Sequence, residues 1–406
     1  MKILAPLILG LLASLLFPPY FFLPLGLIIF PILCKLTEEN LNQNKIYEIF
    51  KTGFYFSFSF FFNYLVWIIN PFFIYEETKN YFYLSVFLIL LLSSIFSIIF
   101  YIIVRFNKIL PIYVIIPIIF VLSEFLISNL FYGFPWINFS LILSGNSHLS
   151  LPLRYFGSFI TSYLVIQIFC LPYLIFKKTT AKEIKLLFAS IIIPLLVLII
   201  YNLPVFNNNK FEENKIEVEI FQLNKNLTDN NNLLNIENKI LKNIYSSNAD
   251  LIIFAENNYP KLIKKLEFPK IQSILNDHQN VVIGGTRVEG KQYYNSLLNI
   301  SKFKVSLFDK KILVPFGEFL PLRKYMNFLS PISGLNDYSI GEELRLIDIQ
   351  KNLNYIPIIC YEIIFYWKII NNKNYNADFI VNITNDSWFG TRSGPYQHFY
   401  ISRIKA

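Results

Sequence analysis

Long apolar runs fill the first half of this chain and constrain its fold more than any other feature. Residues 1–204 consist of such runs separated by short polar breaks, whereas residues 205–406 mix apolar and polar stretches as a soluble domain does. Only 16% of the residues are charged, against about a quarter in soluble globular proteins. We therefore expect a membrane domain over residues 1–204 and a soluble domain over residues 205–406.

A helix that crosses a bilayer needs about 20 apolar residues. The runs predict seven such helices, at residues 3–18, 20–36, 52–74, 82–104, 109–130, 155–176 and 184–203. Lys2 and the run after it resemble a signal peptide, but no small-residue cleavage site follows them. We therefore expect the first run to be kept.

The basic residues between the runs predict an orientation, because Lys and Arg are enriched on the cytoplasmic side. If the N-terminus is cytoplasmic, the inside segments contain Lys2, Lys35, Lys45, Lys51, Arg105, Lys108, Lys177, Lys178, Lys182 and Lys185. The outside loops contain Lys79 and Arg154. Seven spans in a bacterial inner membrane then place residues 205–406 in the periplasm. Many of the basic residues behind the net charge of +9 thus lie in loops between the apolar runs, where they set the membrane orientation. We therefore exclude nucleic acid as a partner.

Two features of the membrane half stand out. Glu124 lies inside an apolar run, where a carboxylate is costly and marks a functional site. A position near the interface, where Glu124 caps a helix or is solvated, explains it equally well. We interpret the Phe-Pro-Trp of residues Gly133–Trp136 as an interfacial aromatic belt.

The second half alternates strand-length and helix-length segments. The predicted strands are Ile216–Gln222, Leu251–Phe254, Val281–Gly284, Val305–Phe308, Ile356–Ile359 and Phe379–Ile383. The predicted helices are Asn235–Tyr245 and Tyr259–Asn276. Such alternation predicts a layered α/β domain.

Cys360 is the cysteine whose position in the sequence suggests a catalytic role. Cys34 and Cys170 fall in apolar runs and are interpreted as small buried hydrophobes. Cys360 follows the predicted strand Ile356–Ile359, and a turn from strand to helix would expose its thiol and direct backbone N–H groups at it. We therefore predict a nucleophile at Cys360.

A thiol nucleophile needs a base. His278 lies in a polar turn that predicts a surface position, and His398 has no motif around it, so a Cys–His pair stays possible but unsupported. Glu256 follows the buried strand Leu251–Phe254, where partial burial raises a carboxyl pKa toward that of a general base. No Cys/His cluster has the spacing of metal ligands.

Lys310 and Glu318 lie eight residues apart, after another predicted strand and around a Pro-Phe-Gly turn. A charged surface loop would explain these residues without any chemistry. Alternatively, a lysine here stabilises an oxyanion.

These segments occur in an order that resembles the nitrilase (carbon–nitrogen hydrolase) superfamily, whose triad is Glu–Lys–Cys. Leu313–Glu318 reads LVPFGE, Cys360–Glu362 reads CYE and Asn385–Gly390 reads NDSWFG. Together with Gly133–Trp136 and Tyr294–Leu297 they are similar to the branch that places this domain after a multispan membrane half, the apolipoprotein N-acyltransferases.

The resemblance implies a polytopic helical membrane domain followed by an α-β-β-α sandwich. It implies that Glu256 is the general base, Lys310 the oxyanion-stabilising lysine and Cys360 the nucleophile. Spacing selects Lys310 over Lys311, because the family's lysine lies eight residues before the Glu of PFGE. By the same resemblance the supporting residues are Glu318, Asn295, Tyr361 and Glu362.

The implied reaction is N-acylation of the diacylglyceryl-modified N-terminal cysteine of apolipoproteins by ping-pong transfer from a phospholipid, with no metal or cofactor. Two departures from the family pattern stand out. Asn224–Asn232 lacks the tryptophan that the family carries on a mobile arm, and the family continues past Ala406 with further strands and a last membrane helix. A membrane-tethered amidase, an inactive truncated homologue and a transporter therefore remain as alternatives.

The Lys/Arg asymmetry generates a test of topology. A reporter that is active only after export, fused near residue 210, should be active in cells. A reporter that works only in the cytoplasm, fused at the same point, should be silent. The reverse pattern would contradict both the orientation and the lipoprotein substrate.

Overall fold

The computed structural model describes residues 3–177, 180–202, 215–223, 233–342, 344–349, 353–370, 374 and 377–405. The chain divides into two compact units. The helical unit comprises Met1–Asn70, Phe82–Lys210 and Phe389–Ile404. The sandwich unit comprises Pro71–Tyr81, Phe211–Trp388 and Lys405–Ala406. The predicted boundary between residues 204 and 205, and the segment Asn224–Asn232, lie outside the described residues.

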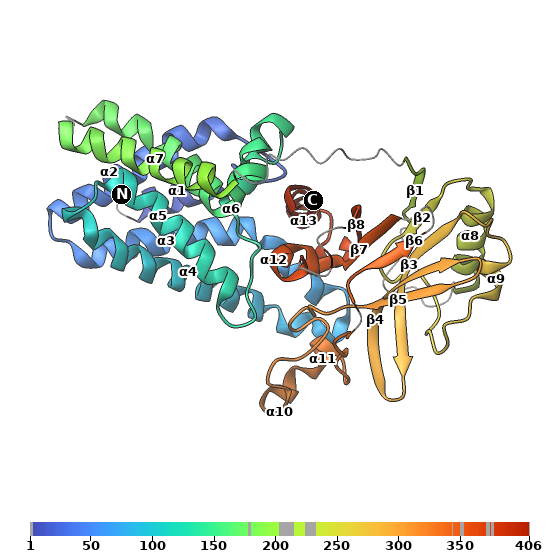
Figure 1. The fold of residues 1–406 in the computed structure, drawn as a ribbon. Helices are drawn as coiled ribbons and strands as arrows, with labels where there is room; N and C mark the ends of the chain where they lie inside the picture. The colour runs from blue at the N-terminus through green and yellow to red at the C-terminus, as the bar shows by residue number, and fades with distance from the viewer. Residues whose placement is uncertain are drawn as a thin grey trace. The chain divides into compact units, whose positions relative to one another are not determined.

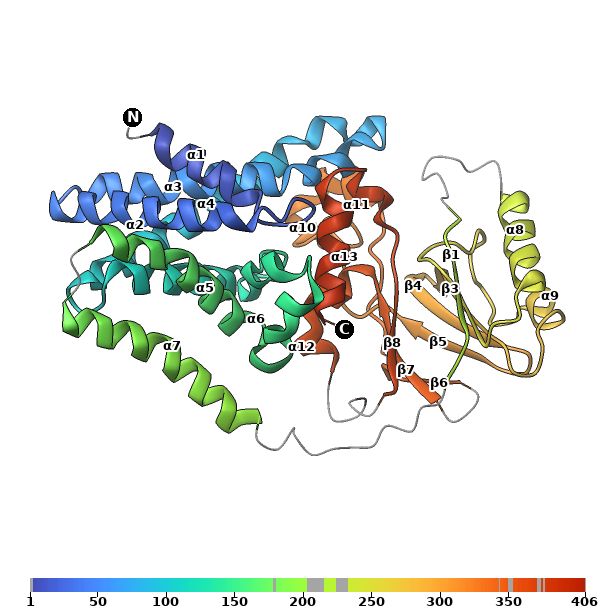
Figure 2. The same ribbon diagram turned by 90° about the horizontal axis from the view of Figure 1, so that it is seen from above.

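Long helices form most of the helical unit. They are α1 (Leu4–Ser14), α2 (Gly26–Asn42), α3 (Ile46–Tyr64), α4 (Tyr83–Ile103), α5 (Ile112–Asn129), α6 (Ser147–Cys170), α7 (Ala181–Asn202) and α13 (Ser393–Lys405). Helix α3 packs against both α1 and α4, as Figure 2 shows. Glycines allow the close approach: a Cβ atom at Gly10 would lie 2.0 Å from the carbonyl oxygen of Phe56.

Several of these helices can cross a membrane. Within the described residues, three helical segments are long and apolar enough: Glu76–Lys108, Ile112–Asn129 and Ser147–Ile175. The pair Ile46–Tyr64 and Val66–Phe73, bent by 47°, makes a fourth if it forms one span. The chain is therefore a membrane protein, and the number of seven spans stays a prediction.

Two sheets build the sandwich unit. The first has the order β1-β2-β3-β4-β5 and the second the order β6-β7-β8. Their strands are β1 (Val218–Phe221), β2 (Leu251–Phe254), β3 (Asn280–Glu289), β4 (Gln292–Ser301), β5 (Val305–Asp309), β6 (Ile347–Ile349), β7 (Leu353–Ile359) and β8 (Phe379–Ile383). Strands β1–β3 pair in parallel, and so do β7 and β8, whereas β3–β4, β4–β5 and β6–β7 pair antiparallel.

Further helices complete both units. The α-helices are α8 (Leu233–Ser246), α9 (Pro269–Gln272), α10 (Arg323–Met326), α11 (Ser330–Ser333) and α12 (Tyr366–Ile369). The 3-10 helices are η1 (Leu23–Leu25), η2 (Val66–Phe73), η3 (Glu76–Tyr81), η4 (Val104–Lys108), η5 (Phe139–Leu143), η6 (Leu171–Phe176), η8 (Asn327–Leu329), η9 (Cys360–Phe365) and η10 (Asp386–Phe389).

The sandwich unit is layered. Helices α8 and α9 cover one face of the five-stranded sheet (Figure 1), where Ile240 and Ile271 join Phe254 and Val281 in one apolar core. On the opposite face β4 meets β7, and the hydroxyl of Tyr355 donates to Asn299 at 3.4 Å. These layers confirm the predicted α/β sandwich.

The six predicted strands are confirmed, but β4 and β6 were not predicted as strands. The predicted helix Tyr259–Asn276 is wrong over most of its length, because α9 is its only α-helical part. The backbone N–H groups of Tyr259 and Ile263 donate to carbonyls of β3, which pairs this segment with that strand. Pairing with a strand thus overrides local helix propensity.

The core predicts a stability difference between two phenylalanines. Phe254 is fully buried and stacks on Phe221 with ring centroids 5.4 Å apart, so Phe254→Ala should destabilise the sandwich unit by about 3–5 kcal/mol. Phe303 is 75% exposed, and Phe303→Ala should change stability by less than about 0.5 kcal/mol. Pulse proteolysis of the detergent-solubilised chain in urea measures both. Equal losses would contradict the assigned core.

Candidate active site

Cys360 lies on a tight turn. Strand β7 ends at Ile359 and η9 begins at Cys360, whose φ of 53° falls in the left-handed region that L-residues rarely adopt. Such positive φ values in side-chain-bearing residues concentrate at functional sites. The predicted turn after the strand is therefore confirmed. The expectation that it exposes the thiol is wrong, since Cys360 is 7% exposed and η9 is buried around it.

Glu256 and Lys310 follow different strands of the five-stranded sheet and meet. Glu256 comes two residues after β2 and Lys310 directly after β5. Lys310 Nζ lies 3.7 Å from Glu256 Oε1 and 2.9 Å from Glu318 Oε1. The lysine side chain is 1% exposed, so its charge depends on these two carboxylates.

Asn295 on β4 joins the two carboxylates. Its Nδ2 donates at 2.7 Å to Glu256 Oε1 and at 2.7 Å to Glu318 Oε1. Glu318 Oε2 accepts from the backbone N–H of Val314 at 2.8 Å, which closes the loop that follows Lys310. Glu256, Lys310, Glu318 and Asn295 thus form one buried polar cluster.

Lys310 and Lys311 are adjacent in the sequence, but their side chains have different partners. Lys311 Nζ turns away and donates to the carbonyl of Glu342 at 3.3 Å. Successive side chains on an extended segment point in opposite directions. Lys310 is therefore the lysine that the structure brings to the cluster.

The backbone holds Glu256 closely on two sides. Asn385, two residues beyond β8, donates its backbone N–H to Glu256 Oε2 at 3.0 Å. A Cβ atom at Gly284 on β3 would lie 2.6 Å from the Glu256 Cα atom, so that position requires glycine. The first residue of the NDSWFG motif thus contributes through its main chain, which sequence reasoning did not resolve.

Burial dominates the electrostatics of the cluster. It raises the pKa of the Glu256 carboxyl, which Lys310 lowers and Glu318 raises further. Burial lowers the pKa of Lys310, but Glu318 and Glu256 outweigh it, so the pKa is raised and the ammonium stays charged. Burial raises the pKa of the Cys360 thiol well above its usual range, and Glu256 adds to that rise while Lys310 opposes it. The resting group is therefore a thiol.

The two residues after Cys360 are also buried. The Tyr361 ring packs edge-on against Phe365 with centroids 5.3 Å apart, and burial raises the pKa of its hydroxyl. Glu362 is fully buried and binds the guanidinium of Arg345, with Nη2 and Oε1 2.7 Å apart. Sequence reasoning missed Arg345, because no motif surrounds it.

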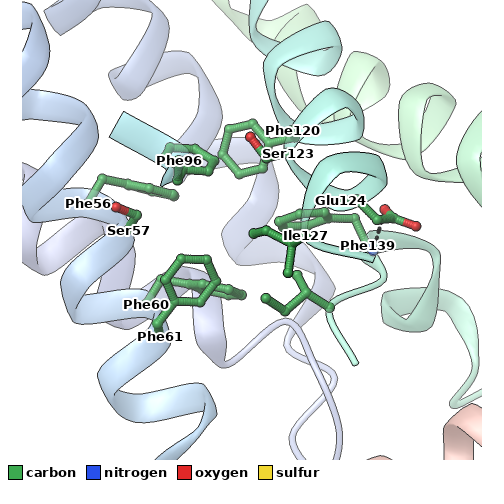
Figure 3. A pocket seen from close by; sticks show the side chains of 11 residues that line it. Phe56, Ser57, Phe60, Phe61, Phe96, Phe120, Ser123, Glu124, Ile127 and Phe139 are labelled. Atoms are coloured by element: carbon green, nitrogen blue, oxygen red, sulfur yellow. Dashed lines mark hydrogen bonds between the residues drawn. The ribbon is translucent and has the colours of Figure 1, made fainter. Parts of the chain in front are cut away.

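The two features of the membrane half are both buried in the helical unit. Glu124 is 2% exposed, and its Oε2 accepts from the backbone N–H of Phe139 at 3.2 Å beside a small cavity lined by aromatic rings (Figure 3). It therefore binds the first backbone N–H of η5, away from solvent. Trp136 is fully buried, so its interpretation as part of an interfacial belt is wrong.

Gln397 on α13 explains why Trp136 can be buried. Its Oε1 accepts from the indole N–H groups of Trp67 and Trp136, each at 2.8 Å, and its Nε2 donates to the carbonyl of Tyr64 at 2.9 Å. Sequence reasoning missed this residue. His398, beside it, is buried and stacks on Trp136 at 5.5 Å, whereas His278 is exposed, as predicted.

Comparison with known families agrees with the fold. The carbon–nitrogen hydrolase family model matches residues 218–406. The model described as the apolipoprotein N-acyltransferase N-terminal domain matches residues 9–171. Apolar helices together with a carbon–nitrogen hydrolase sandwich define a membrane-bound enzyme of the carbon–nitrogen hydrolase class.

Curated relatives narrow this class. An apolipoprotein N-acyltransferase of Rickettsia typhi is 31% identical over 422 residues, which cover 98% of this chain and 82% of the relative. That of Wigglesworthia glossinidia brevipalpis is 32% identical over 449 residues, which cover 100% and 83%. The chain belongs to the apolipoprotein N-acyltransferase family and is an acyltransferase.

The charges around Cys360 predict its reactivity. A thiol with a raised pKa reacts only as the pH rises through that value, so methanethiosulfonate should modify Cys360 only in alkaline solution. Glu256→Gln removes a charge that raises the thiol pKa and should move the pH profile down, whereas Lys310→Met should move it up. Mass spectrometry of the Cys360 peptide distinguishes modification of Cys360 from modification of Cys34 or Cys170. Shifts of the opposite sign would contradict this electrostatic arrangement.

Proposed function

We propose that this enzyme moves an acyl chain from a phospholipid to the α-amine of an S-diacylglyceryl-cysteine at the N-terminus of an apolipoprotein, through a thioester on Cys360. The observation that carries the proposal is the buried ammonium of Lys310 between Glu256 and Glu318, with Cys360 on a positive-φ turn in its electrostatic field. A carboxylate, an ammonium and a thiol are the base, oxyanion stabiliser and nucleophile that acyl transfer requires.

In the first half-reaction Glu256 takes the proton of the Cys360 thiol as the sulfur attacks the sn-1 ester carbonyl. The raised thiol pKa makes this base necessary, because little thiolate exists beforehand. The Lys310 ammonium stabilises the negative oxygen of the tetrahedral intermediate. The carbon–oxygen bond then breaks, the leaving lysophospholipid oxygen receives the proton from Glu256, and a thioester remains.

In the second half-reaction the α-amine of the modified cysteine attacks the thioester carbonyl. Glu256 takes a proton from the amine, Lys310 again stabilises the oxyanion, and the carbon–sulfur bond breaks. The released thiolate is reprotonated by Glu256, which restores the starting state. An amide has formed, and every step uses side chains of this chain alone.

The remaining cluster residues position these groups. Asn295 and Glu318 hold the carboxylate of Glu256 and the ammonium of Lys310 in place by hydrogen bonds of 2.7–2.9 Å. Tyr361 packs beside the nucleophile turn, and Glu362 organises the backbone around it.

We further propose the bacterial inner membrane as the location, with residues 1–204 in the membrane and residues 205–406 in the periplasm. The Lys/Arg asymmetry of the loops supports this topology. Both proposed substrates are lipid-anchored, so an active site on a membrane-bound chain meets them at the bilayer surface.

The decisive experiment traps the thioester. The purified chain, mixed with a phospholipid labelled in its sn-1 acyl chain, should acquire a label that hydroxylamine releases. Cys360→Ala should abolish labelling, and Cys34→Ala and Cys170→Ala should retain it. Transfer of the label to a diacylated lipopeptide completes the test. Release of free fatty acid in its place would identify a hydrolase, and labelling of Cys360→Ala would refute the mechanism.

Neighbouring lysines provide a matched pair. A placed base contributes about 10²–10⁴-fold and one oxyanion donor about 10²–10³-fold. Glu256→Gln and Lys310→Ala should therefore each slow thioester formation at least about 100-fold. Lys311→Ala should leave the rate within a few-fold, because that side chain faces away. If Lys311→Ala slows thioester formation and Lys310→Ala does not, the assignment of Lys310 as the oxyanion-stabilising lysine is wrong.

A further inference from the structure

Glu362 connects the two loops that carry the proposed lysine and nucleophile. Its Oε1 accepts from the backbone N–H groups of Lys311 at 2.9 Å and Ile312 at 3.1 Å, directly after Lys310. Its Oε2 accepts from the backbone N–H of Ile359 at 2.9 Å, directly before Cys360. One carboxylate therefore holds the main chain on both sides of the site.

The carboxylate of Glu362 is fully buried, and a buried charge needs a counter-charge. Within the described residues, Glu362 forms an ion pair with Arg345. The pair is bidentate: Nη2 lies 2.7 Å from Oε1 and Nη1 lies 3.0 Å from Oε2. Two parallel hydrogen bonds fix the orientation of the carboxylate as well as its charge.

Arg345 also contacts the strands that lead into both loops. Its Nη1 donates to the carbonyl of Pro357 on β7 at 3.0 Å. Its guanidinium carbon lies 4.6 Å from the ring centroid of Phe308 on β5, a cation–π contact. The Arg345 side chain is 5% exposed, so all of these contacts are shielded from water.

We propose that Arg345 is a positioning residue for acyl transfer: through Glu362 it holds the Lys310 loop and the Cys360 turn in one register. The proposal rests on the function proposed above for Lys310 and Cys360. Arg345 itself touches no reacting atom. Its effect is geometric, because the thiol and the oxyanion donor must face the same carbonyl group of the substrate.

Three variants separate charge, geometry and stability. Arg345→Met keeps much of the side-chain length but removes the charge. Arg345→Lys keeps the charge but lacks the planar fork. Leu275→Ala truncates a residue of the apolar core between α8, α9 and the sheet, away from both loops. It serves as a control with lowered stability.

The kinetic readout is acyl transfer from a labelled phospholipid to a diacylated lipopeptide by the full chain in detergent. A displacement near 1 Å can cost about 100-fold in rate, so Arg345→Met should lower kcat by at least about tenfold and leave KM unchanged. Arg345→Lys should recover part of the rate. Leu275→Ala should retain the kcat of its folded fraction.

Amide hydrogen exchange supplies a readout that needs no activity. The peptide containing Lys311 and Ile312 should lose protection in Arg345→Met and keep it in Leu275→Ala. If Arg345→Met fails to fold, Arg345→Lys replaces it in both measurements and should show an intermediate kcat with partial loss of protection.

Unchanged protection of this peptide, or an unchanged kcat, would overturn the role of Arg345. So would a raised KM at constant kcat, or equal losses in Leu275→Ala. Failure of the wild-type chain to form any Cys360 thioester would instead refute the proposed function. The hydrogen-exchange data would still show whether Arg345 stabilises the loop that contains Lys311 and Ile312.

Discussion

The buried ammonium of Lys310 is the interaction on which the rest of the site depends. Glu256 and Glu318 bind it and Asn295 bridges them, so segments that follow β2 and β5 meet β4 and the loop at Val314. Removing one partner of a buried ion pair costs about 3–5 kcal/mol, because the other charge stays behind. The cluster is therefore both the proposed chemical site and a link between sheet and loops.

Burial, together with the excess of negative charge in this cluster, keeps the pKa of the Cys360 thiol raised. Two carboxylates face one ammonium, and together with burial they keep the sulfur protonated at rest. Thiols react as thiolates, so a protonated thiol is protected from adventitious oxidation and alkylation. In the proposed mechanism, chemistry begins only when a base removes this proton next to a bound ester.

Hydrogen-bond satisfaction also organises the helical unit. Trp67 and Trp136 are large and buried, and both direct their N–H groups at Gln397. An unsatisfied polar group in an apolar environment costs free energy, so this glutamine allows the aromatic cluster to exist. It also explains why residues 389–404, predicted with the soluble domain, belong with the membrane helices.

Local patterns in the sequence determined where strands end, and hence that Glu256, Lys310 and Cys360 follow them. The resemblance to the family, through its eight-residue spacing to Glu318, selected Lys310 over Lys311. Tertiary structure alone decided which side chains meet: Arg345 binds Glu362, Asn295 bridges two carboxylates and Gln397 joins two indoles. It also decided that Tyr259 and Ile263 pair with β3 and that the Cys360 thiol is buried. Periodicity shows that a position is buried, but a hydrogen bond between distant residues depends on how the chain packs.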